Sequence, residues 1–594
     1  MRLLSRTGGA VAAAAALVLG GATATPAPAA PAAYRVTVGS PVPFPNPTDT
    51  PASPFLDKDG TFHYQQAAAL YGAADPRSWD FYTGTDFDTA TFDHSLSDAV
   101  NPANPNDRND DTTWRCNNSP TGREADYAPA GSGYAQKNYC DLVGVWVDPD
   151  TGDWYGLVHN EFTPQPFGDG LHFDAIDYAV STDQGHTWTI EDHAITSPYS
   201  TVRGDTAAFP HETYDYGDGD QRLFVDTASG YFYVYYGSRI VDKKGGWKAF
   251  YEHVARAPIS AKMAPGSWRK WYDGAWSQPG AGGKESNIVP VDTGHPTGYT
   301  PAAAEYDPAT TGTTSEQIAA GKTPPTSPLF VMNIAYDAYL GLYIGEPQAV
   351  DQSGTSPQYL YATDDLATQK WHLLGDTGGY TNASWYRWFL DGVNRTGSSI
   401  VGRTVRSYCA YGCSHDADGE YVDLTLDSTT PATPPVDAGR RYRIASGAGR
   451  ILVQRPGGSA TTAAPPTPTA RASWTFEPTG DGAYTVANAA TGGLLGVDSR
   501  TTASRAWGTK PVVTARHGGE PAVGQQWFLL PDTSPAGTYR LVNRYSGLVL
   551  GLSADSGRLA ETTPARTWTD TSGSAVGPGR TAAEQTLTLA PVEK

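Results

Sequence analysis

The sequence is poor in charge and in nucleotide-binding or nucleophile motifs, and each shortage narrows what the protein can be. Only 18% of its 594 residues are charged, and acids outnumber bases by 62 to 42. The net charge of -20 disfavours nucleic acid and anionic membrane surfaces, so we expect neither as a partner. No glycine-rich nucleotide loop and no G-x-S-x-G elbow occurs. A neutral, hydroxyl-rich partner such as an oligosaccharide or polysaccharide fits the composition better.

Long apolar runs are missing except at the N-terminus. There, Arg2 and Arg6 precede the apolar run from Ala10 to Leu19, and Ala-x-Ala sites follow. The run is too short to span a bilayer, so residues 1–33 are predicted to be a secretory signal peptide. We therefore expect a secreted, extracellular, soluble protein, and a monomer.

Cysteine is scarce, with four residues in two local pairs: Cys116 with Cys140, and Cys409 with Cys413. In an oxidising compartment this spacing favours two disulfides. A metal cluster is the weaker alternative, because no CxxC pair exists and the two pairs lie far apart. We expect no metal and no cofactor, although a structural calcium ion at the DPDTGD turn (Asp148–Asp153) is an alternative to a hydrogen-bonded Asx turn.

Glycine, proline and aromatic residues are abundant, with 65 Gly, 46 Pro and 34 Tyr, which is typical of all-β proteins with many turns. One design, a turn followed by an aromatic apolar run, occurs three times: TGDWYGLVH, SGYFYVYYG and DAYLGLYIG. Such repeats are typical of four-stranded propeller blades. Similar runs from Phe55 and Trp385 would add a first and a last blade. We therefore expect a five-bladed β-propeller over residues 34–426, with six blades or a β-sandwich as alternatives.

A further signature is STDQGHTW, from Ser181 to Trp188, which fits the S-x-D-x-G-x-x-W pattern called an Asp box. In sialidase-like propellers, which it resembles, this box is a turn at the blade periphery. That resemblance implies that Asp183 accepts turn hydrogen bonds, that Gly185 permits the backbone and that Trp188 packs between strands. We interpret the motif as structural.

After a Pro/Thr-rich linker, residues 427–438, the repeat changes. YRIASGAGRIL, YTVANAATGGLL and YRLVNRYSGLVL begin three units, and QQW matches a Q-x-W signature. Residues 439–594 therefore resemble the ricin-B-like β-trefoil family, a lectin fold. The carboxylate that this family uses in each sugar pocket is replaced at Val453, Gly496 and Gly551, with Asp498 as a possible substitute. Sugar binding and a docking or stabilising role both remain open for this domain.

Three acidic segments carry the catalytic hypothesis. CDLVGVWVDPDTGDWYGLVHNE resembles the first-blade motif of invertase/levanase-type propellers, with Asp141 and Gly144 in the family's positions. DQRLFVDTASGYFYVYYGS resembles a motif of arabinanase/xylosidase-type propellers and begins at Asp220. GGKESNIVP places Glu285 where that family has a third acid, and Glu305 is the competitor.

These resemblances imply a propeller glycoside hydrolase. Cleavage of a glycosidic bond needs a carboxylic acid that protonates the leaving oxygen and a carboxylate that attacks or activates water. The resemblance makes Asp141 the base or nucleophile, Glu285 the acid and Asp220 the group that orients the acid and raises its pKa. Nearby acids and histidines are candidate substrate-binding residues: His159, Glu161, Asp174, His211 and Glu212. Each could instead be a structural turn or surface residue.

The substrate that the resembled families favour is a furanosidic polysaccharide such as arabinan or fructan. Two other functions remain open. A sialidase-like exoglycosidase would need an arginine cluster, for which Arg203 and Arg239 are available. A non-catalytic carbohydrate-binding protein would show aromatic side chains without convergent acids.

Overall fold

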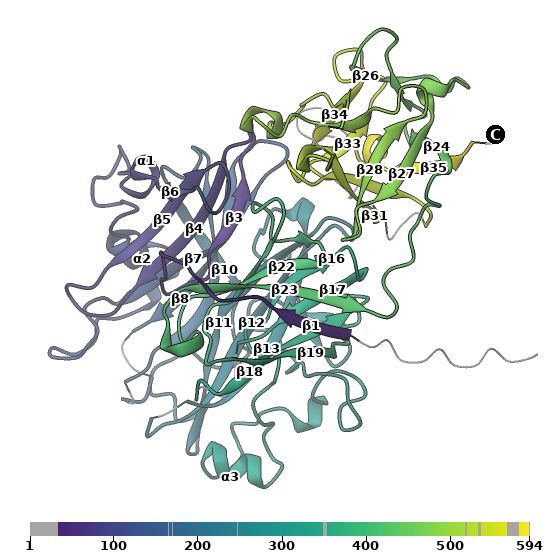
Figure 1. Ribbon diagram of the computed structural model, residues 1–594. Coiled ribbons are helices and arrows are strands. Elements are labelled where there is room, and N and C mark those ends of the chain that lie inside the picture. The colour runs from purple at the N-terminus through teal and green to yellow at the C-terminus, as the bar shows by residue number, and fades with distance from the viewer. Residues whose placement is uncertain are drawn as a thin grey trace, which may run out of the picture.

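The computed structural model describes residues 34–163, 166–168, 170–245, 247–348, 353–516, 519–532, 536–566 and 581–592, so the predicted signal peptide lies outside the described residues. The described chain forms two all-β domains, a propeller and a trefoil (Figure 1). Its α-helices are short: α1 (His94–Ser97), α2 (Thr113–Asn118), α3 (Thr314–Ala319) and α5 (Ala582–Gln585). None of the described helices is long and apolar enough to cross a membrane.

Five blades form the propeller, as predicted, and each runs outward from an inner strand. Blade I is β3 (Ser53–Leu56), β4 (Phe62–Ala69), β5 (Arg77–Gly84) and β6 (Thr91–Phe92). Blade II is β7 (Asn138–Val147), β8 (Trp154–Phe162), β9 (Phe173–Ser181) and β10 (Thr189–Ile195). Blade III is β11 (Thr213–Asp226), β12 (Tyr231–Asp242), β13 (Trp247–Pro258), β14 (Arg269–Tyr272) and β15 (Ala275–Pro279).

Blades IV and V complete the ring. Blade IV is β16 (Asn333–Asp337), β17 (Leu342–Glu346), β18 (Ser356–Thr363) and β19 (His372–Asn382), with β21 (Ile400–Val401) beside β16. Blade V is β20 (Trp388–Asp391), β22 (Thr404–Cys409) and β23 (Glu420–Ser428), with β2 (Val42–Pro43) and an outer strand, β1 (Tyr34–Val38), from the start of the chain. Because β1 pairs with β23, the first and last parts of the propeller are joined by backbone hydrogen bonds.

Apolar side chains fill each of the five gaps between neighbouring blades, which is what a closed ring requires. The strands read as nearly continuous buried runs, since both faces of a blade pack on a neighbour. One residue pair from each gap illustrates the packing: Trp79 and Trp154 (I–II), Leu157 and Phe232 (II–III), Tyr235 and Trp371 (III–IV), Leu360 and Phe389 (IV–V), and Tyr64 and Trp388 (V–I).

The Asp box is the turn between β9 and β10, and its predicted structural role is confirmed. Asp183 accepts a hydrogen bond from the backbone N–H of Thr187 at 2.9 Å. Gly185 has φ +88°, a left-handed conformation that glycine adopts without strain. Trp188 is buried in the core between blades I and II.

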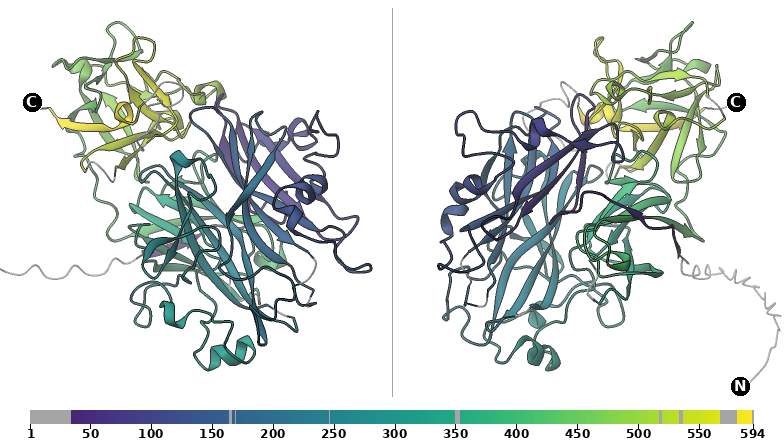
Figure 2. Two further views of the ribbon diagram at one scale, coloured as in Figure 1. Left: turned by 180° about the vertical axis from the view of Figure 1, so that it is seen from behind. Right: turned by 60° about the vertical axis from the view of Figure 1, so that its left-hand side comes forward.

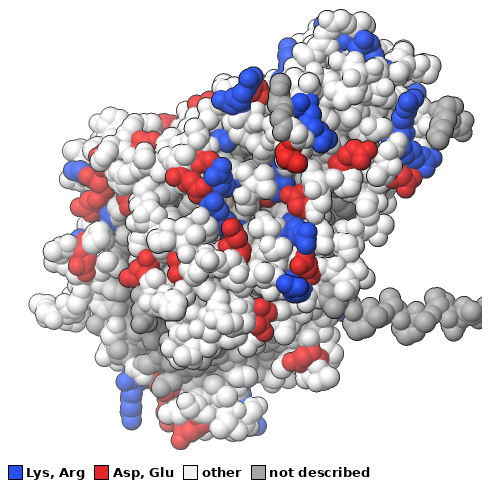
Figure 3. Space-filling model, viewed as in Figure 1, with Lys and Arg blue, Asp and Glu red and all other residues white. Residues whose placement is uncertain are grey.

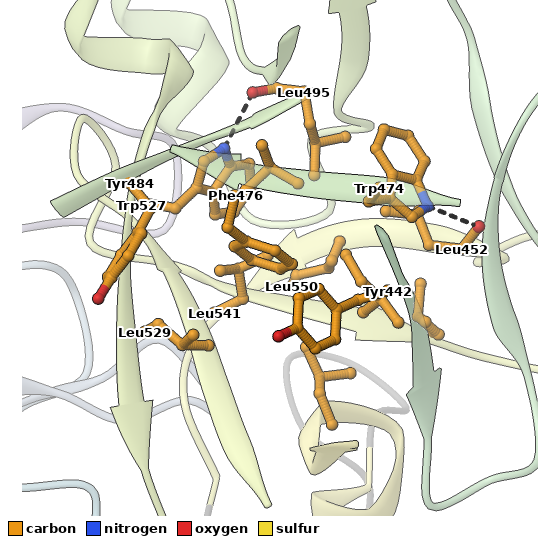
Figure 4. Packing of buried hydrophobic residues seen from close by; sticks show 14 of the residues in the cluster. Tyr442, Leu452, Trp474, Phe476, Tyr484, Leu495, Trp527, Leu529, Leu541 and Leu550 are labelled. Atoms are coloured by element: carbon orange, nitrogen blue, oxygen red, sulfur yellow. Dashed lines mark hydrogen bonds between the residues drawn. The ribbon is translucent and has the colours of Figure 1, made fainter. Parts of the chain in front are cut away.

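The trefoil shows the predicted three repeats. Its strands are β24 (Arg441–Ser446), β25 (Ile451–Gln454), β26 (Thr461–Ala464), β27 (Trp474–Pro478), β28 (Ala483–Asn488), β29 (Leu494–Gly496), β30 (Val512–Thr514), β31 (Gln526–Pro531), β32 (Tyr539–Asn543), β33 (Val549–Leu552), β34 (Ala560–Thr563) and β35 (Leu587–Pro591). Trp474 and Trp527 play the same part in successive repeats, because their indole N–H groups donate to Leu452 O at 3.0 Å and Leu495 O at 2.9 Å (Figure 4). Leu587 fills the core in the third repeat.

The trefoil covers one mouth of the propeller, where the inner strands end, and the two domains lie against each other in every view (Figures 1 and 2). A cavity of about 440 Å³ lies between them. The trefoil contributes Trp507 and Leu530 to the wall of this cavity. Each of the five blades also contributes to the wall, through Leu56, Val147, Asp226, Tyr336 and Asn394. The other mouth, where the inner strands begin, is not covered by the trefoil.

An ion pair buried at this domain interface joins Arg544 of the trefoil to Asp391 at the end of β20. The distance from Arg544 Nη2 to Asp391 Oδ2 is 2.8 Å, and both side chains are fully buried. Arg544 also contacts Asp481 at 2.5 Å. On the face seen in Figure 3, acidic and basic side chains are interspersed, and neither sign forms a broad patch.

Replacing Arg544 by Ala should destabilise the full chain strongly, because it leaves the Asp391 carboxylate buried without its cation. Loss of one partner of a buried pair typically costs about 3–5 kcal/mol. Arg500→Ala is the matched control: its pair with Asp498 lies on the surface, with the Arg500 side chain 87% exposed, and should be worth at most about 1 kcal/mol. Thermal unfolding of both variants measures this, and equal shifts of the midpoint would contradict the role of Arg544.

Candidate active site

Carboxylates from three blades meet at the uncovered mouth. We call this group, Asp49, Asp141, Glu161, Asp174 and Asp220, the acid mouth. Blade II supplies three of its members on one face, because Asp141 lies opposite His159, and Glu161 lies opposite Asp174, in the antiparallel pairing of β7, β8 and β9. The structure therefore brings together Asp141, Asp220 and the predicted binding residues of blade II.

Asp220 reaches this group through a β-bulge in β11. The register of β11 against β12 shifts between Gly219 and Arg222, and Asp220 has φ +53°. Aspartate tolerates this left-handed conformation better than most residues, and bulges often redirect a side chain next to a functional site. Here the backbone nitrogen of Asp220 lies 3.2 Å from Nδ1 of His159.

Blades II and III touch at Asp174. Gly217 on β11 pairs in parallel with Asp174 on β9, and Gly217 has φ +104°. A Cβ atom at Gly217 would lie 2.2 Å from the Asp174 carbonyl oxygen. Glycine is therefore needed at this position for the two strands to approach.

Two histidines and an arginine neutralise the buried acids. Nε2 of His159 lies 3.4 Å from Asp174 Oδ2, and its Nδ1 lies 3.6 Å from Asp220 Oδ1. Nε2 of His172 lies 3.0 Å from Glu161 Oε2 and 3.2 Å from Asp174 Oδ1. Arg239 of β12 contacts Asp220 directly and Asp174 at 3.4 Å. From the sequence, Arg239 was considered only for the arginine cluster of a sialidase-like site.

These contacts lower the pKa of two carboxyl groups of the acid mouth, those of Asp220 and Asp174. Burial opposes the charge on Asp220, but Arg239 and His159 outweigh it and lower the pKa of Asp220 below its usual value. Burial likewise opposes the charge on Asp174, yet His159 and His172 lower its pKa. The pKa of His159 is raised well above its ordinary value, because Asp174 and Asp220 outweigh its burial. These residues form a charged network at neutral pH.

Asp49 and Asp141 behave in the opposite way. Burial, followed by the negative charges of Asp49 and Glu161, raises the pKa of Asp141 well above its usual value. Burial and the charges of Glu161 and Asp220 raise the pKa of Asp49 to about 7. One Asp141 oxygen, Oδ1, is buried and has no hydrogen-bond partner among the described residues. The acid mouth therefore holds protonated and ionised carboxyl groups side by side.

Asp49 was missed because its segment, NPTDTP, has no strand pattern. Two threonines fix it: Thr48 Oγ1 donates to Ala67 O at 3.0 Å, and Thr50 Oγ1 accepts from Ala67 N–H at 2.9 Å. Asp49 lies between them, and Tyr386 of blade V hydrogen-bonds to it. The usable signal was its place just before an inner strand, at the mouth where Asp141 also lies.

Tyrosines line the acid mouth. Tyr71 hydrogen-bonds to Glu161. The Tyr216 hydroxyl forms a hydrogen bond of 2.6 Å with Nε2 of His172. Tyr386 and Tyr411 lie on the blade V side, and the charge of Asp49 raises the pKa of both beyond the effect of burial. Hydroxyl groups and aromatic faces therefore border the carboxylates.

Glu285, predicted to lie beside Asp141, makes its contacts with residues of blade III outside the acid mouth. Glu285 Oε2 lies 2.6 Å from Lys270 Nζ and accepts from the Tyr236 hydroxyl at 2.8 Å. Lys270 is fully buried on β14 and also contacts Asp218 at 3.0 Å. A buried ammonium needs such partners, so Glu285 is held within blade III. The competitor Glu305 binds the backbone N–H of Asn287.

His211 and Glu212 are also placed elsewhere. Both precede β11, and Glu212 is exposed and accepts from Gly312 N–H at 2.7 Å. Thr213 and Asp220 are seven steps apart along β11, which is at most about 23 Å at about 3.3 Å per residue. The length of β11, 14 residues, thus removes this pair from the mouth.

The remaining predicted features are structural. Disulfides join Cys116 to Cys140 and Cys409 to Cys413, as expected. In the DPDTGD turn, Asp148 Oδ1 accepts from Asp150 N–H at 3.0 Å, and Lys262 Nζ lies 2.6 Å from Asp148 Oδ2. In the trefoil, the Asp498 carboxylate is held by Arg500 at 2.8 Å.

Comparisons with known proteins locate the trefoil and find distant structural likenesses. Residues 470–568 match the family model described as ricin-type beta-trefoil lectin domain-like. No curated protein matches the chain. Solved structures similar to the whole chain include an exo-β-1,3-galactanase from Clostridium thermocellum, at 12% identity over 93% of this chain and 100% of that one, with a TM-score of 0.31.

A GH43 β-1,3-galactosidase is similar at 10% identity over 93% of this chain and 94% of that one, with a TM-score of 0.30. The trefoil is similar to the Macrolepiota procera ricin B-like lectin in complex with lactose, at 22% identity over 26% of this chain and 97% of that one, with a TM-score of 0.20. At these scores the likenesses are too distant to assign an activity to this chain.

Replacing Asp141 by Asn should stabilise the protein at pH 8 and leave its stability unchanged near pH 4. With its raised pKa, Asp141 holds a proton in the folded state that the unfolded chain loses above about pH 4, so its contribution falls as pH rises. Asn removes this penalty.

Asp220→Asn is the matched contrast and should destabilise the protein at pH 8. The pKa of Asp220 is lowered on folding, so its ionised form stabilises the fold above its unfolded pKa, and this contribution is lost as pH falls. Thermal unfolding midpoints at pH 4, 6 and 8 test both. Shifts of the same sign in the two variants would contradict the divided ionisation.

Proposed function

We propose that the chain is a secreted glycoside hydrolase that cleaves glycosidic bonds in a furanosidic polysaccharide such as arabinan or fructan. The observation that carries this proposal is the convergence at the acid mouth of Asp220, which Arg239 contacts, and Asp141, whose buried Oδ1 has no hydrogen-bond partner among the described residues. Glycoside cleavage needs a protonated and an ionised carboxyl group on either side of one bond. Asp49, Asp141 and Asp220 lie close enough to act on each other's pKa values and differ in protonation.

The burial of each acid suggests its role. Asp141 is 5% exposed and its pKa is raised well above the usual value, so we assign it the general acid that protonates the leaving oxygen. Asp49 is half-buried, and its pKa of about 7 makes it available as a carboxylate that activates water. Asp220, kept ionised by Arg239, would stabilise the positive charge that develops on the sugar.

In these steps the proton on Asp141 moves to the glycosidic oxygen as the bond to the anomeric carbon breaks. Asp49 takes a proton from the water whose oxygen bonds to that carbon. After the reaction Asp49 carries a proton and Asp141 is ionised, and proton exchange with solvent restores the starting state. This assignment replaces Glu285 as the acid, because Glu285 is bound to Lys270.

Substitution tests the roles directly. Asp49→Asn and Asp141→Asn should each lower kcat by about 10²–10⁴-fold, the usual contribution of a general acid or base. Glu285→Gln should retain turnover, since Glu285 lies outside the acid mouth. The assay is release of reducing sugar from arabinan, levan, arabinogalactan, xylan and β-1,3-galactan. Full activity of Asp141→Asn would remove it from the mechanism, and no hydrolysis by the unmodified protein would leave a carbohydrate-binding role.

The pH dependence of kcat/KM should show an acidic limb near pH 7. This profile reports groups of the free enzyme, and the ionised form of Asp49 is needed as base, so activity should fall as pH drops through about 7. A limb near pH 4, the ordinary range of an aspartate, would exclude Asp49 as the base.

A further inference from the structure

A cluster of aromatic rings borders the acid mouth on the side of blades I and II. Tyr71 follows β4, Tyr134 lies in the segment before β7, Tyr139 is on β7, and His172 precedes β9. The Tyr71 ring centroid lies 5.0 Å from that of Tyr134, 5.1 Å from that of Tyr139 and 5.5 Å from that of His172. Tyr71 also hydrogen-bonds to Glu161, so the cluster is continuous with the carboxylates.

Tyr139 is the most buried tyrosine of this cluster, and Tyr71 and Tyr134 are more exposed. Tyr139 is 1% exposed and serves as core, whereas Tyr71 and Tyr134 are only partly buried. The outer rings are nevertheless held in place. The Tyr134 hydroxyl donates to Gly170 O at 2.8 Å, and the carbonyl oxygen of Tyr71 accepts hydrogen bonds from the Tyr139 hydroxyl at 3.0 Å and from the Ala135 N–H at 2.9 Å. A fixed ring with an accessible face needs no ordering when a ligand binds.

The segment that carries Tyr134 is tied to the catalytic acid. The disulfide between Cys116 and Cys140 closes the loop that contains Tyr134. Cys140 directly precedes Asp141, so one covalent link fixes the start of β7 and the end of this loop. The position of the ring relative to Asp141 is therefore set by a short, rigid path.

We propose that Tyr134, backed by Tyr71, is the stacking platform for a second sugar ring of the substrate, adjacent to the sugar whose bond is cleaved at the acid mouth. A tyrosine presents an apolar face to the C–H surface of a sugar while its hydroxyl stays hydrogen-bonded. The substrate is then a chain of at least two sugar units that extends over blade II. This proposal rests on the proposed hydrolase function and adds a positioning residue to it.

The kinetic test compares a chain substrate with a single-sugar substrate. Tyr134→Ala should raise KM about tenfold for arabinotriose, the size of one lost aromatic contact, with kcat changed less than about twofold. For p-nitrophenyl arabinofuranoside, which has one sugar, KM should stay the same within about twofold. Tyr134→Phe keeps the ring and should retain the low KM. Galactotriose and p-nitrophenyl galactoside form a second substrate pair.

Tyr127→Ala is the matched control, because Tyr127 lies in the same disulfide-closed loop and is 64% exposed. It should leave KM unchanged for both substrates. Equal KM changes for the chain and the single sugar in Tyr134→Ala, or the same change in Tyr127→Ala, would overturn the platform.

Binding separates this proposal from the hydrolase assignment. Calorimetry of arabinotriose and galactotriose with Asp141→Asn, alone and combined with Tyr134→Ala, measures affinity without turnover. A roughly tenfold weaker affinity in the double variant supports the platform even if the unmodified protein hydrolyses nothing, in which case only the proposed catalysis fails. Equal affinities refute the platform whatever the turnover.

Discussion

The contact between Asp220 and Arg239 is the interaction on which the acid mouth depends. Both side chains are buried, with 5% and 9% of their surface exposed, and either charge alone would be costly in the interior. Their pairing is extended by Asp174 and His159, so blades II and III share one network. Because every member is held by at least one opposite charge, the geometry decides which carboxyl groups ionise. Among the described residues, Asp49 and Asp141 form no ion pair, and their raised pKa values keep them protonated to higher pH.

This network has catalytic meaning only because the ring is closed. Asp49 comes from blade I, Asp141 from blade II, Asp220 from blade III and Tyr386 from blade V, and packing between all neighbouring blades brings them to one mouth. The backbone hydrogen bonds between β1 and β23 join the two ends of the propeller chain and close the ring. The trefoil, fixed through Arg544, covers the opposite mouth. The trefoil therefore has a structural role at the propeller, whether or not it binds sugars.

The sequence allowed the blades to be predicted because each repeats a local pattern of turn and aromatic strand. Asp141 and Asp220 could be found for the same reason, since both stand on inner strands within such a pattern. Glu161 and Asp174 lie beside Asp141 and His159 because β7, β8 and β9, which follow one another in the chain, pair in the sheet. These are local or nearest-strand relations, which a sequence reveals.

Relations between distant elements were not predictable in the same way. Asp49 lies in an irregular segment that is fixed by two threonine hydrogen bonds to Ala67 on a neighbouring strand. Glu285 matched a motif, but Lys270, 15 residues earlier on β14, captures it. His211 and Glu212 stand at the start of a strand that proved to be 14 residues long. In each case the decisive partner comes from packing that no local motif reports.

The backbone around Asp141 explains how an unfavourably buried acid is kept in place. Trp79 Nε1–H of blade I donates to the carbonyl oxygen of Cys140 at 2.9 Å, and Gln65 Nε2–H donates to that of Leu142 at 2.8 Å. These bonds hold both residues that flank Asp141, while the Cys116–Cys140 disulfide fixes the chain on the other side. The raised pKa of Asp141 makes its burial costly at neutral pH, so the carboxyl group would otherwise turn toward water. Rigidity supplied by blade I therefore maintains the protonated acid, and catalysis at this site would depend on residues that never touch the substrate.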